Sequence, residues 1–387
     1  MQDELSQLLV GKAVTNPGRE FPLERYEQAL SAYLANVARM DTVRAVYQIG
    51  SIGVPGLSDI DLVVVLRDGP RDFLHRYGIA RLSEEDRYLF SHDPLIIEAR
   101  TFAKLHLWYP VREQDLKHLA GETLPRDPMT ELQNRIKLLH LAQCLLCYQF
   151  QMFRHHTYFG ETIDQRVSEN AIKGFCNSVA LWLDVKGSAT DSKFGSFRDR
   201  YLDFRKTWFR LDAGSRARAL TTYAAQASAL AFELIGEVDS ELRSNWFKPV
   251  SLGEIEFQMG GDRFSFKSVW APAAAARHFA TTQGLLFPLS FAAFMLAYRE
   301  SRGSIGRHVR AKFGAAAATP VQFIRPEAAS AVALHIEALD EYSNFNPRRF
   351  RVGPNPFVTF WAPYSTSRAV RAFNRGYNKL RRLVDQV

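Results

Sequence analysis

Apolar residues in the first third of the chain follow both helix-like and strand-like patterns. Between Pro22 and Met40 they recur every three or four residues, which predicts an amphipathic helix. Ala45 to Ile49 reads as a short strand, and Leu62 to Leu66 is an unbroken aliphatic run, typical of a central strand buried on both faces. Two more strands are predicted, at Leu95 to Ala99 and at Leu105 to Tyr109. Helices beside a small mixed sheet make this an α+β unit.

Helical spacing dominates the middle of the chain. Asp127 followed by Pro128 is typical of a helix start, and the apolar pattern continues to about His155. Further helical patterns run over residues 165–185, 197–210 and 213–235. This predicts an all-helical domain over residues 127–245.

The pattern becomes mixed beyond residue 245. Apolar runs at Glu254 to Met259 and Arg263 to Trp270 flank a Gly-Gly-Asp turn, which predicts a hairpin. The near-apolar run Leu285 to Tyr298 has 14 residues, whereas about 20 are needed to span a bilayer, so a buried helix is expected there. Residues 328–339 have a helical pattern.

These patterns divide the chain into five parts. They are an N-terminal arm that is loose apart from one short helix (1–20), the α+β domain (21–126), the helical domain (127–245), a smaller mixed region (246–345), and a connector with a terminal amphipathic helix (346–387).

The composition of the chain indicates the cellular compartment in which the protein is expected. Three cysteines in 387 residues argue against a disulfide framework, and the mixed polar sequence of residues 1–20 does not resemble a secretory signal. A cytoplasmic protein without a transmembrane segment is therefore expected. Cys144 and Cys147 lie inside a predicted helix with no second pair, so packing is a better interpretation of them than a metal site.

The net charge of +8 is concentrated at one end of the chain. Residues 346–387 contain nine Lys and Arg residues and one acid, Asp385, so the preceding 345 residues are electrically neutral overall. This basic segment has two interpretations: a packed helix with a solvated cationic face, or a surface for an anionic partner such as RNA, an anionic lipid or a glycan.

One short stretch carries the chemistry, between Gln48 and Leu66. A strand ends at Gly50 and Ser51, a glycine-containing turn follows, and Asp59 and Asp61 open the next strand. Residues two apart on a strand project the same way, so the two carboxylates are expected side by side, where a hard divalent cation would offset their repulsion. Unpaired N–H groups in a Gly-Ser turn can accept a phosphate. The stretch therefore predicts a metal-dependent nucleotide site.

The pattern Gly50-Ser51 … Asp59-x-Asp61 resembles that of the polymerase-beta-type nucleotidyltransferase superfamily, over roughly residues 25–110. The resemblance implies a nucleotidyltransferase fold and transfer of a nucleoside monophosphate from an NTP such as ATP to an acceptor hydroxyl, with release of pyrophosphate. The acceptor is open: a small molecule, glycan, protein or RNA. It also implies two Mg²⁺ ions bridged by Asp59 and Asp61, and phosphates held by Gly50 and Ser51.

A third carboxylate is expected from a strand beside the one that bears the pair. Glu98 is the first candidate and Asp93 the rival. Seven residues separate Ser51 from Asp59, whereas relatives have nearer ten. The shorter loop motivates an alternative: a non-catalytic module of the same fold, attached to a membrane surface or polyanion through its basic C-terminus.

Overall fold

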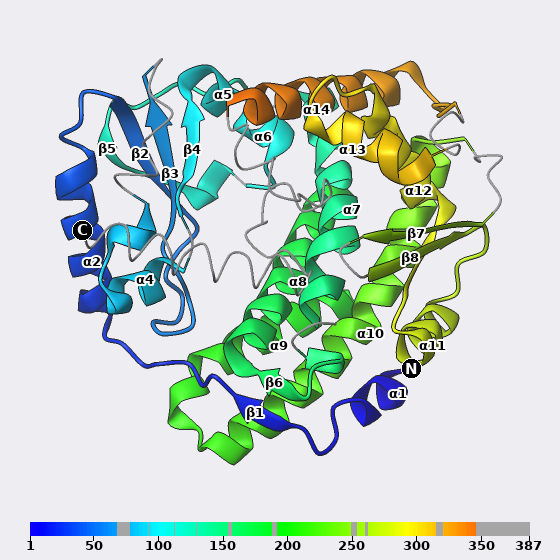
Figure 1. Ribbon diagram of the computed structural model, residues 1–387, viewed down its shortest axis with the longest axis horizontal. Coiled ribbons are helices and arrows are strands. Elements are labelled where there is room, and N and C mark those ends of the chain that lie inside the picture. Colours follow the sequence, from blue (N-terminus) through cyan, green and yellow to red (C-terminus); the bar gives the residue numbers. More distant parts are fainter. Residues whose placement is uncertain are drawn as a thin grey trace.

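The sheet part, the helical middle and the C-terminal region pack together in the computed structural model of the chain (Figure 1). The structure describes residues 1–67, 78–91, 93–111, 113–128, 130–153, 157–187, 192–248, 254–259, 262–314 and 320–345. The predictions for the basic segment 346–387 and for the end of the first long helix at His155 lie outside these residues.

The N-terminal third forms a four-stranded sheet with its flanking helices. The strands of the sheet are β2 (Val43–Ile49), β3 (Asp61–Leu66), β4 (Leu95–Glu98) and β5 (Leu116–Gly121), and β1 (Ala13–Thr15) precedes them outside the sheet. Its helices are α1 (Gln2–Gln7), α2 (Leu23–Val37), α4 (Glu84–Phe90), α5 (Ala99–Ala103) and α6 (Leu105–Trp108), with 3-10 turns η1 (Ile79–Arg81) and η2 (Glu113–Asp115).

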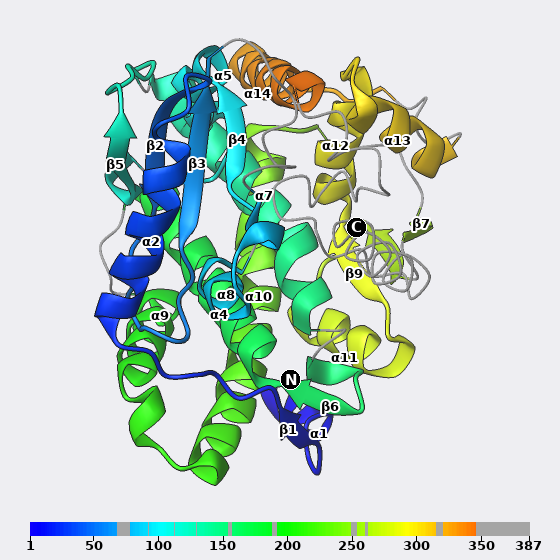
Figure 2. The ribbon, with the colours of Figure 1, turned by 60° about the vertical axis from the view of Figure 1, so that its left-hand side comes forward.

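The sheet is mixed, in the order β4-β3-β2-β5. β2 runs antiparallel to β3 and β5, and β3 runs parallel to β4. Alternate residues of β3 enter two different cores, because successive side chains of a strand point to opposite faces. Leu62 and Val64 pack with α2 and α4, whereas Val63 and Val65 face the helices of the rest of the chain (Figure 2). The α+β class is confirmed.

The segment predicted as a strand at Leu105 to Tyr109 is instead the short helix α6, so that prediction is wrong. Leu105 and Trp108 are both buried, a spacing of three that fits one face of a helix. The Trp108 ring stacks on Tyr342 at 4.2 Å between centroids. Tertiary packing therefore decided the local structure.

The N-terminal arm is not loose. Its short helix α1 is confirmed and packs against helices of the middle and C-terminal parts. β1 then pairs in parallel with β6 (Thr162–Asp164). The Lys12 ammonium donates to the carbonyls of Thr157 and Gly160, at 3.2 and 3.0 Å, and to that of Tyr158. Burial lowers the Lys12 pKa. The arm is thus fixed along the helical part.

Long helices form the middle of the chain, as predicted. They are α7 (Glu131–Phe153), α8 (Gln165–Lys186), α9 (Lys193–Lys206) and α10 (Ala213–Asn245), with the 3-10 turn η4 (Trp208–Arg210). The first of them starts after the predicted Asp127 cap, whose N–H instead donates to the Ala103 carbonyl at 3.0 Å. β6 is the one departure from an all-helical part among the described residues of 127–245.

The C-terminal region contains the predicted hairpin and a strand that was not predicted. Its elements are β7 (Ile255–Met259), β8 (Asp262–Lys267), α11 (Pro272–Thr282), β9 (Leu285–Pro288), α12 (Leu289–Ala297), η5 (Tyr298–Glu300), α13 (Ser304–Phe313) and α14 (Pro326–Phe345). The apolar run Leu285 to Tyr298 divides into β9, parallel to β8, and the buried helix α12. In the described part of the chain, no helix is long and apolar enough to cross a membrane.

One continuous core joins the parts. It contains buried residues from Leu5 in the arm to Tyr342 in α14. α14 lies along α5, α6 and α7 and so ties the C-terminal region to the sheet (Figure 1). Burial raises the pKa values of the Cys144 and Cys176 thiols to about 12, which makes them packed, unreactive side chains.

Candidate active site at the entry of the central strand

The predicted pair of carboxylates lies where the chain enters β3. Ile60 and Leu62 are buried in the core beneath α2. Asp59 and Asp61 alternate with these two residues in the sequence, and both are partly exposed. Asp61 is the first residue of β3, and Asp59 lies two residues before it.

The last turn of α4 holds this entry in place. The Ile60 N–H donates to the Leu89 carbonyl at 2.8 Å. The Ser91 hydroxyl donates to Asp59 Oδ2. Ser91 itself has φ +51°, in the left-handed region that non-glycine residues rarely adopt. A strained residue that bonds to a candidate metal ligand is a feature of functional sites.

Gly50 does not offer its N–H to a phosphate in this structure, contrary to the expectation. That N–H donates to the Asp115 carbonyl at 2.6 Å. Gly50 has φ +69°, and a Cβ there would meet nothing within 4 Å, so glycine serves the reversal of the chain rather than a close approach. Ser51 follows it on the surface, exposed. Asp115, which directly precedes β5, lies at the same end of the sheet as Asp61.

The short turn before Asp59 is closed by hydrogen bonds of its own. The Ser58 hydroxyl accepts from the Val54 N–H at 3.1 Å, and the Ser58 N–H donates to the Val54 carbonyl at 2.8 Å. The Gly53 N–H donates to the Ser51 carbonyl at 3.0 Å. Within the described turn, the N–H groups of Ser51 and Ile52 donate to no other group. These two N–H groups and the Ser51 hydroxyl are therefore the donors that the turn presents.

Two tyrosine hydroxyls form hydrogen bonds with the backbone of Gly56, one with its N–H and one with its carbonyl. Tyr26 accepts from the Gly56 N–H at 2.8 Å and donates to the Ser58 carbonyl at 2.6 Å. Tyr88 donates to the Gly56 carbonyl at 3.0 Å and accepts from the Arg19 N–H at 2.8 Å. Burial raises the Tyr26 pKa to about 12, so this hydroxyl stays protonated and keeps donating. The turn is a fixed support for the strand entry.

The strand register separates Glu98 from the pair. Glu98 lies opposite Leu66, at the other end of β3 from Asp61. Five residues at about 3.3 Å each put those levels about 16 Å apart. The Glu98 carboxylate instead accepts from Arg100 at 2.9 Å, and Arg100 also contacts Glu341 of α14 at 3.4 Å. Its observed role is thus in an ion-pair network that holds α14.

Asp93, the rival, lies at the right level. Val63 of β3 is opposite Leu95 of β4, so the positions two residues earlier, Asp61 and Asp93, correspond. Asp93 Oδ1 accepts from the Ile79 N–H at 2.8 Å. Asp59, Asp61 and Asp93 thus all lie at or just before the starts of the parallel strands β3 and β4.

These donors suit a magnesium ion that is shared with a nucleotide. No group of three His, Cys, Asp or Glu side chains converges closely enough to hold a metal by itself, among the residues that the structure describes. Mg²⁺ is commonly bound through one or two carboxylates together with substrate phosphates and water. Asp59 and Asp61, half-buried at a strand entry, meet that smaller requirement.

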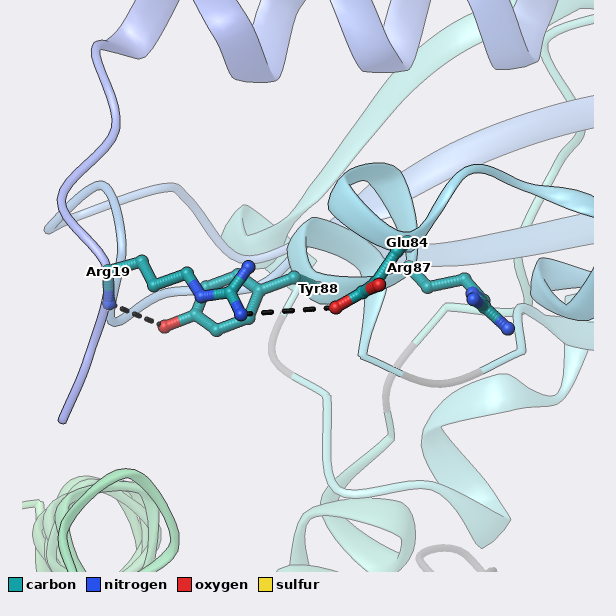
Figure 3. A pocket seen from close by; sticks show the side chains of 4 residues that line it. All are labelled: Arg19, Glu84, Arg87 and Tyr88. Atoms are coloured by element: carbon teal, nitrogen blue, oxygen red, sulfur yellow. Dashed lines mark hydrogen bonds and ion pairs between the residues drawn. The ribbon is translucent and has the colours of Figure 1, made fainter. Parts of the chain in front are cut away.

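A depression of about 390 Å³ lies beside the turn, between the arm and α4 (Figure 3). Arg19, Glu84, Arg87 and Tyr88 line it. The Arg19 guanidinium lies over the Tyr88 ring at 5.5 Å and pairs with Glu84 at 3.9 Å, whereas Arg87 points away from the other three. The depression has no carboxylate from the candidate site.

Sequence reasoning missed the residues that support the site. Tyr88 and Ser91 lie in and just after the last turn of α4, and Arg166 is 78 positions beyond Tyr88. No local spacing connects them with Asp59, because their contacts arise only when α4 and α8 meet the strand entry. Comparisons of the chain with family models, with curated proteins and with solved structures gave no match.

Proposed function

We propose that the chain is a Mg²⁺-dependent nucleotidyltransferase, which transfers a nucleoside monophosphate from an NTP to an acceptor hydroxyl and releases pyrophosphate. The observation that carries the proposal is that Asp61 begins the central strand β3 and that Asp59, two residues before it, accepts a hydrogen bond from Ser91 at the end of α4. A nucleotidyltransferase fold for the sheet part belongs to the same proposal. ATP is the first nucleotide to test.

In this proposal the aspartates act as ligands. Asp59 and Asp61 would hold Mg²⁺, which neutralises phosphate charge and lowers the pKa of an acceptor hydroxyl when it is bound. Ser91 donates to one oxygen of Asp59 and would thereby orient the carboxylate. Asp93, at the level of Asp61, takes the place first given to Glu98, as third carboxylate and acceptor of the hydroxyl proton.

Phosphate binding would use fewer backbone donors than expected. Ser51 supplies its hydroxyl and N–H, and Ile52 supplies a second N–H. Gly50 contributes by turning the chain, since its N–H is bonded to Asp115. The acceptor would lie against the helical part of the chain.

The test is release of pyrophosphate from each NTP with Mg²⁺, together with transfer of an α-phosphate label to the small-molecule and macromolecular fractions of a lysate. Wild type is compared with Asp59→Asn/Asp61→Asn, which keeps the shape and removes both charges. Label transfer that the double variant loses supports the proposal. Transfer at the same rate by the double variant would refute it.

The second candidate is a module of the same fold that binds nucleotide without turnover. The closed hydrogen bonding of the turn from Val54 to Ser58 favours it, because that turn offers few donors for a triphosphate. Attachment to a membrane surface or polyanion would then depend on residues 346–387. Mg²⁺-dependent nucleotide binding without label transfer to any fraction would favour this candidate.

A further inference from the structure

The last turn of α4 connects the strand entry with the helical part of the chain. Three of its residues make three different connections: Tyr88 to α8, Leu89 to Ile60, and Ser91 to Asp59. These positions are almost consecutive, so a shift of this turn would move all three contacts together.

Arg166, in the first turn of α8, makes the contact with Tyr88. Its Nη2 donates to the Tyr88 carbonyl at 2.7 Å, and its guanidinium lies 3.6 Å from the centre of the Tyr88 ring. A planar guanidinium can stack and donate in this way at the same time, which an ammonium cannot. The carbonyl belongs to the C-terminal turn of α4, where the helix dipole also favours a cation.

The arm and the turn meet the same tyrosine from other directions. The Tyr88 hydroxyl joins the Arg19 N–H to the Gly56 carbonyl. Arg166 and Asp59 both act electrostatically on the buried Tyr26 hydroxyl, in opposite senses, so both charges lie near it. Arg166 thus reaches this corner of the candidate site from the helical part, as does Phe209 of η4, whose ring lies beside Gly56.

We propose that Arg166 and Tyr88 are positioning residues: they lock the last turn of α4 against α8 and thereby fix the carboxylate of Asp59. The inference rests on the proposed function for its catalytic consequence. The structural claim is that Arg166 holds the strand entry through Tyr88, Leu89 and Ser91. This claim does not depend on the proposed function.

Arg166→Lys keeps the charge and removes the stacking and the planar geometry. We expect kcat for pyrophosphate release to fall about 10- to 100-fold, because small displacements of reacting groups have effects of that size. The KM for NTP is expected to change less than threefold. Arg200→Lys is the matched control, since Arg200 is exposed on α9, and it should behave as wild type.

Two further variants test the contacts of Tyr88 and of Ser91 separately. Tyr88→Phe loses the hydroxyl bonds to Arg19 and Gly56 but keeps the ring and carbonyl that Arg166 uses, so its fall in kcat should be smaller. Ser91→Ala leaves the left-handed backbone as strained as before and removes only the bond to Asp59. Its kcat should fall as far as that of Arg166→Lys.

Hydrogen exchange distinguishes failure of this inference from failure of the proposed function. Amides in residues 54–61 and 84–91 should exchange faster in Arg166→Lys than in wild type and Arg200→Lys, whether or not the wild type turns over NTP. Unchanged exchange in Arg166→Lys would overturn the inference. In an active wild type, faster exchange with an unchanged kcat would overturn the positioning role.

Discussion

Glu98 of β4 lies beside Leu66 of β3, at the end of that strand opposite to Asp61. In a parallel pair the register fixes which side chains share a level, and here it gives the level of Asp61 to Asp93. The choice between the two predicted third carboxylates therefore depends on strand register, which no residue pattern within either strand specifies.

Asp93→Asn should lower Mg²⁺-dependent pyrophosphate release by about 100-fold, the upper range for loss of a group that supports a metal site. The amide oxygen can still accept from the Ile79 N–H, so the fold should persist. Glu98→Gln removes a charge from the α14 network and should change the rate less than twofold. A large fall with Glu98→Gln and none with Asp93→Asn would contradict the register argument.

The turn before Asp59 requires glycine at position 56. It has φ +91°, and a Cβ there would lie 2.1 Å from the Arg19 carbonyl oxygen. Gly187, after α8, has φ +62° and nothing within 4 Å of the same position. Gly187→Ala should therefore lose about 1 kcal/mol, the conformational cost alone. Gly56→Ala should lose at least about 3 kcal/mol, because the arm must also move. Urea unfolding measures the loss of stability in both variants. Equal losses would show that the arm moves away from Gly56 without cost and would contradict this prediction.

Two buried histidines make α14 docking sensitive to acid. His335 Nδ1 contacts the Leu107 carbonyl, an acceptor only, so it must carry the proton, and Nε2 then accepts from the Tyr298 hydroxyl at 2.6 Å. Burial lowers the His335 pKa to about 4. Burial, and then the neighbouring His335, hold the pKa of His140 well below its ordinary value.

Because these pKa values lie below the unfolded value of about 6.5, the unfolded chain binds more protons at acid pH. Stability should be complete above pH 6.5 and fall as the pH drops toward 4, by about 3 kcal/mol for His335. His335→Gln should be less stable at pH 7 but show a shallower decline, with His140 supplying the remainder. Parallel stability curves for the variant and the wild type would contradict the assignment.

The buried pair of Glu169 and Arg205 should behave differently from a surface pair. Glu169 Oε1 accepts from Arg205 Nε, and both side chains are almost completely buried. Glu169→Gln leaves a buried guanidinium without its counter-charge and should lose 3–5 kcal/mol, roughly the range for broken buried pairs. Glu169→Met/Arg205→Met should recover most of that loss. Lys206→Met, in the exposed pair with Asp203, should lose less than about 1 kcal/mol.

β3 could be predicted because its aliphatic run is unambiguous, and β2 because most of its residues up to the Gly-Ser turn are apolar. β5 could not, since Leu116 to Gly121 contains polar residues and its partner, β2, lies far back in the chain. The strand expected at Leu105 to Tyr109 became a helix because Trp108 packs on Tyr342, more than two hundred residues away. Non-local packing overrode the local preference there.

The candidate site shows the same division. Asp59 and Asp61 are two positions apart at the start of a predicted strand, so the expectation of a common direction follows from alternation alone. Ser91, Tyr88 and Arg166 come from other elements, and only the packing of α4 and α8 brings them together. The sequence thus predicted the candidate ligands, whereas the residues that contact them became visible only in the structure.

The most direct test of the central claim is calorimetric titration of the folded protein with a non-hydrolysable analogue of each NTP, with and without Mg²⁺. The account predicts Mg²⁺-dependent binding of at least one analogue by the wild type, weakened at least about tenfold in both Asp59→Asn and Asp61→Asn. A folded wild type that binds none of the analogues with Mg²⁺, or binding that neither substitution weakens, would contradict it.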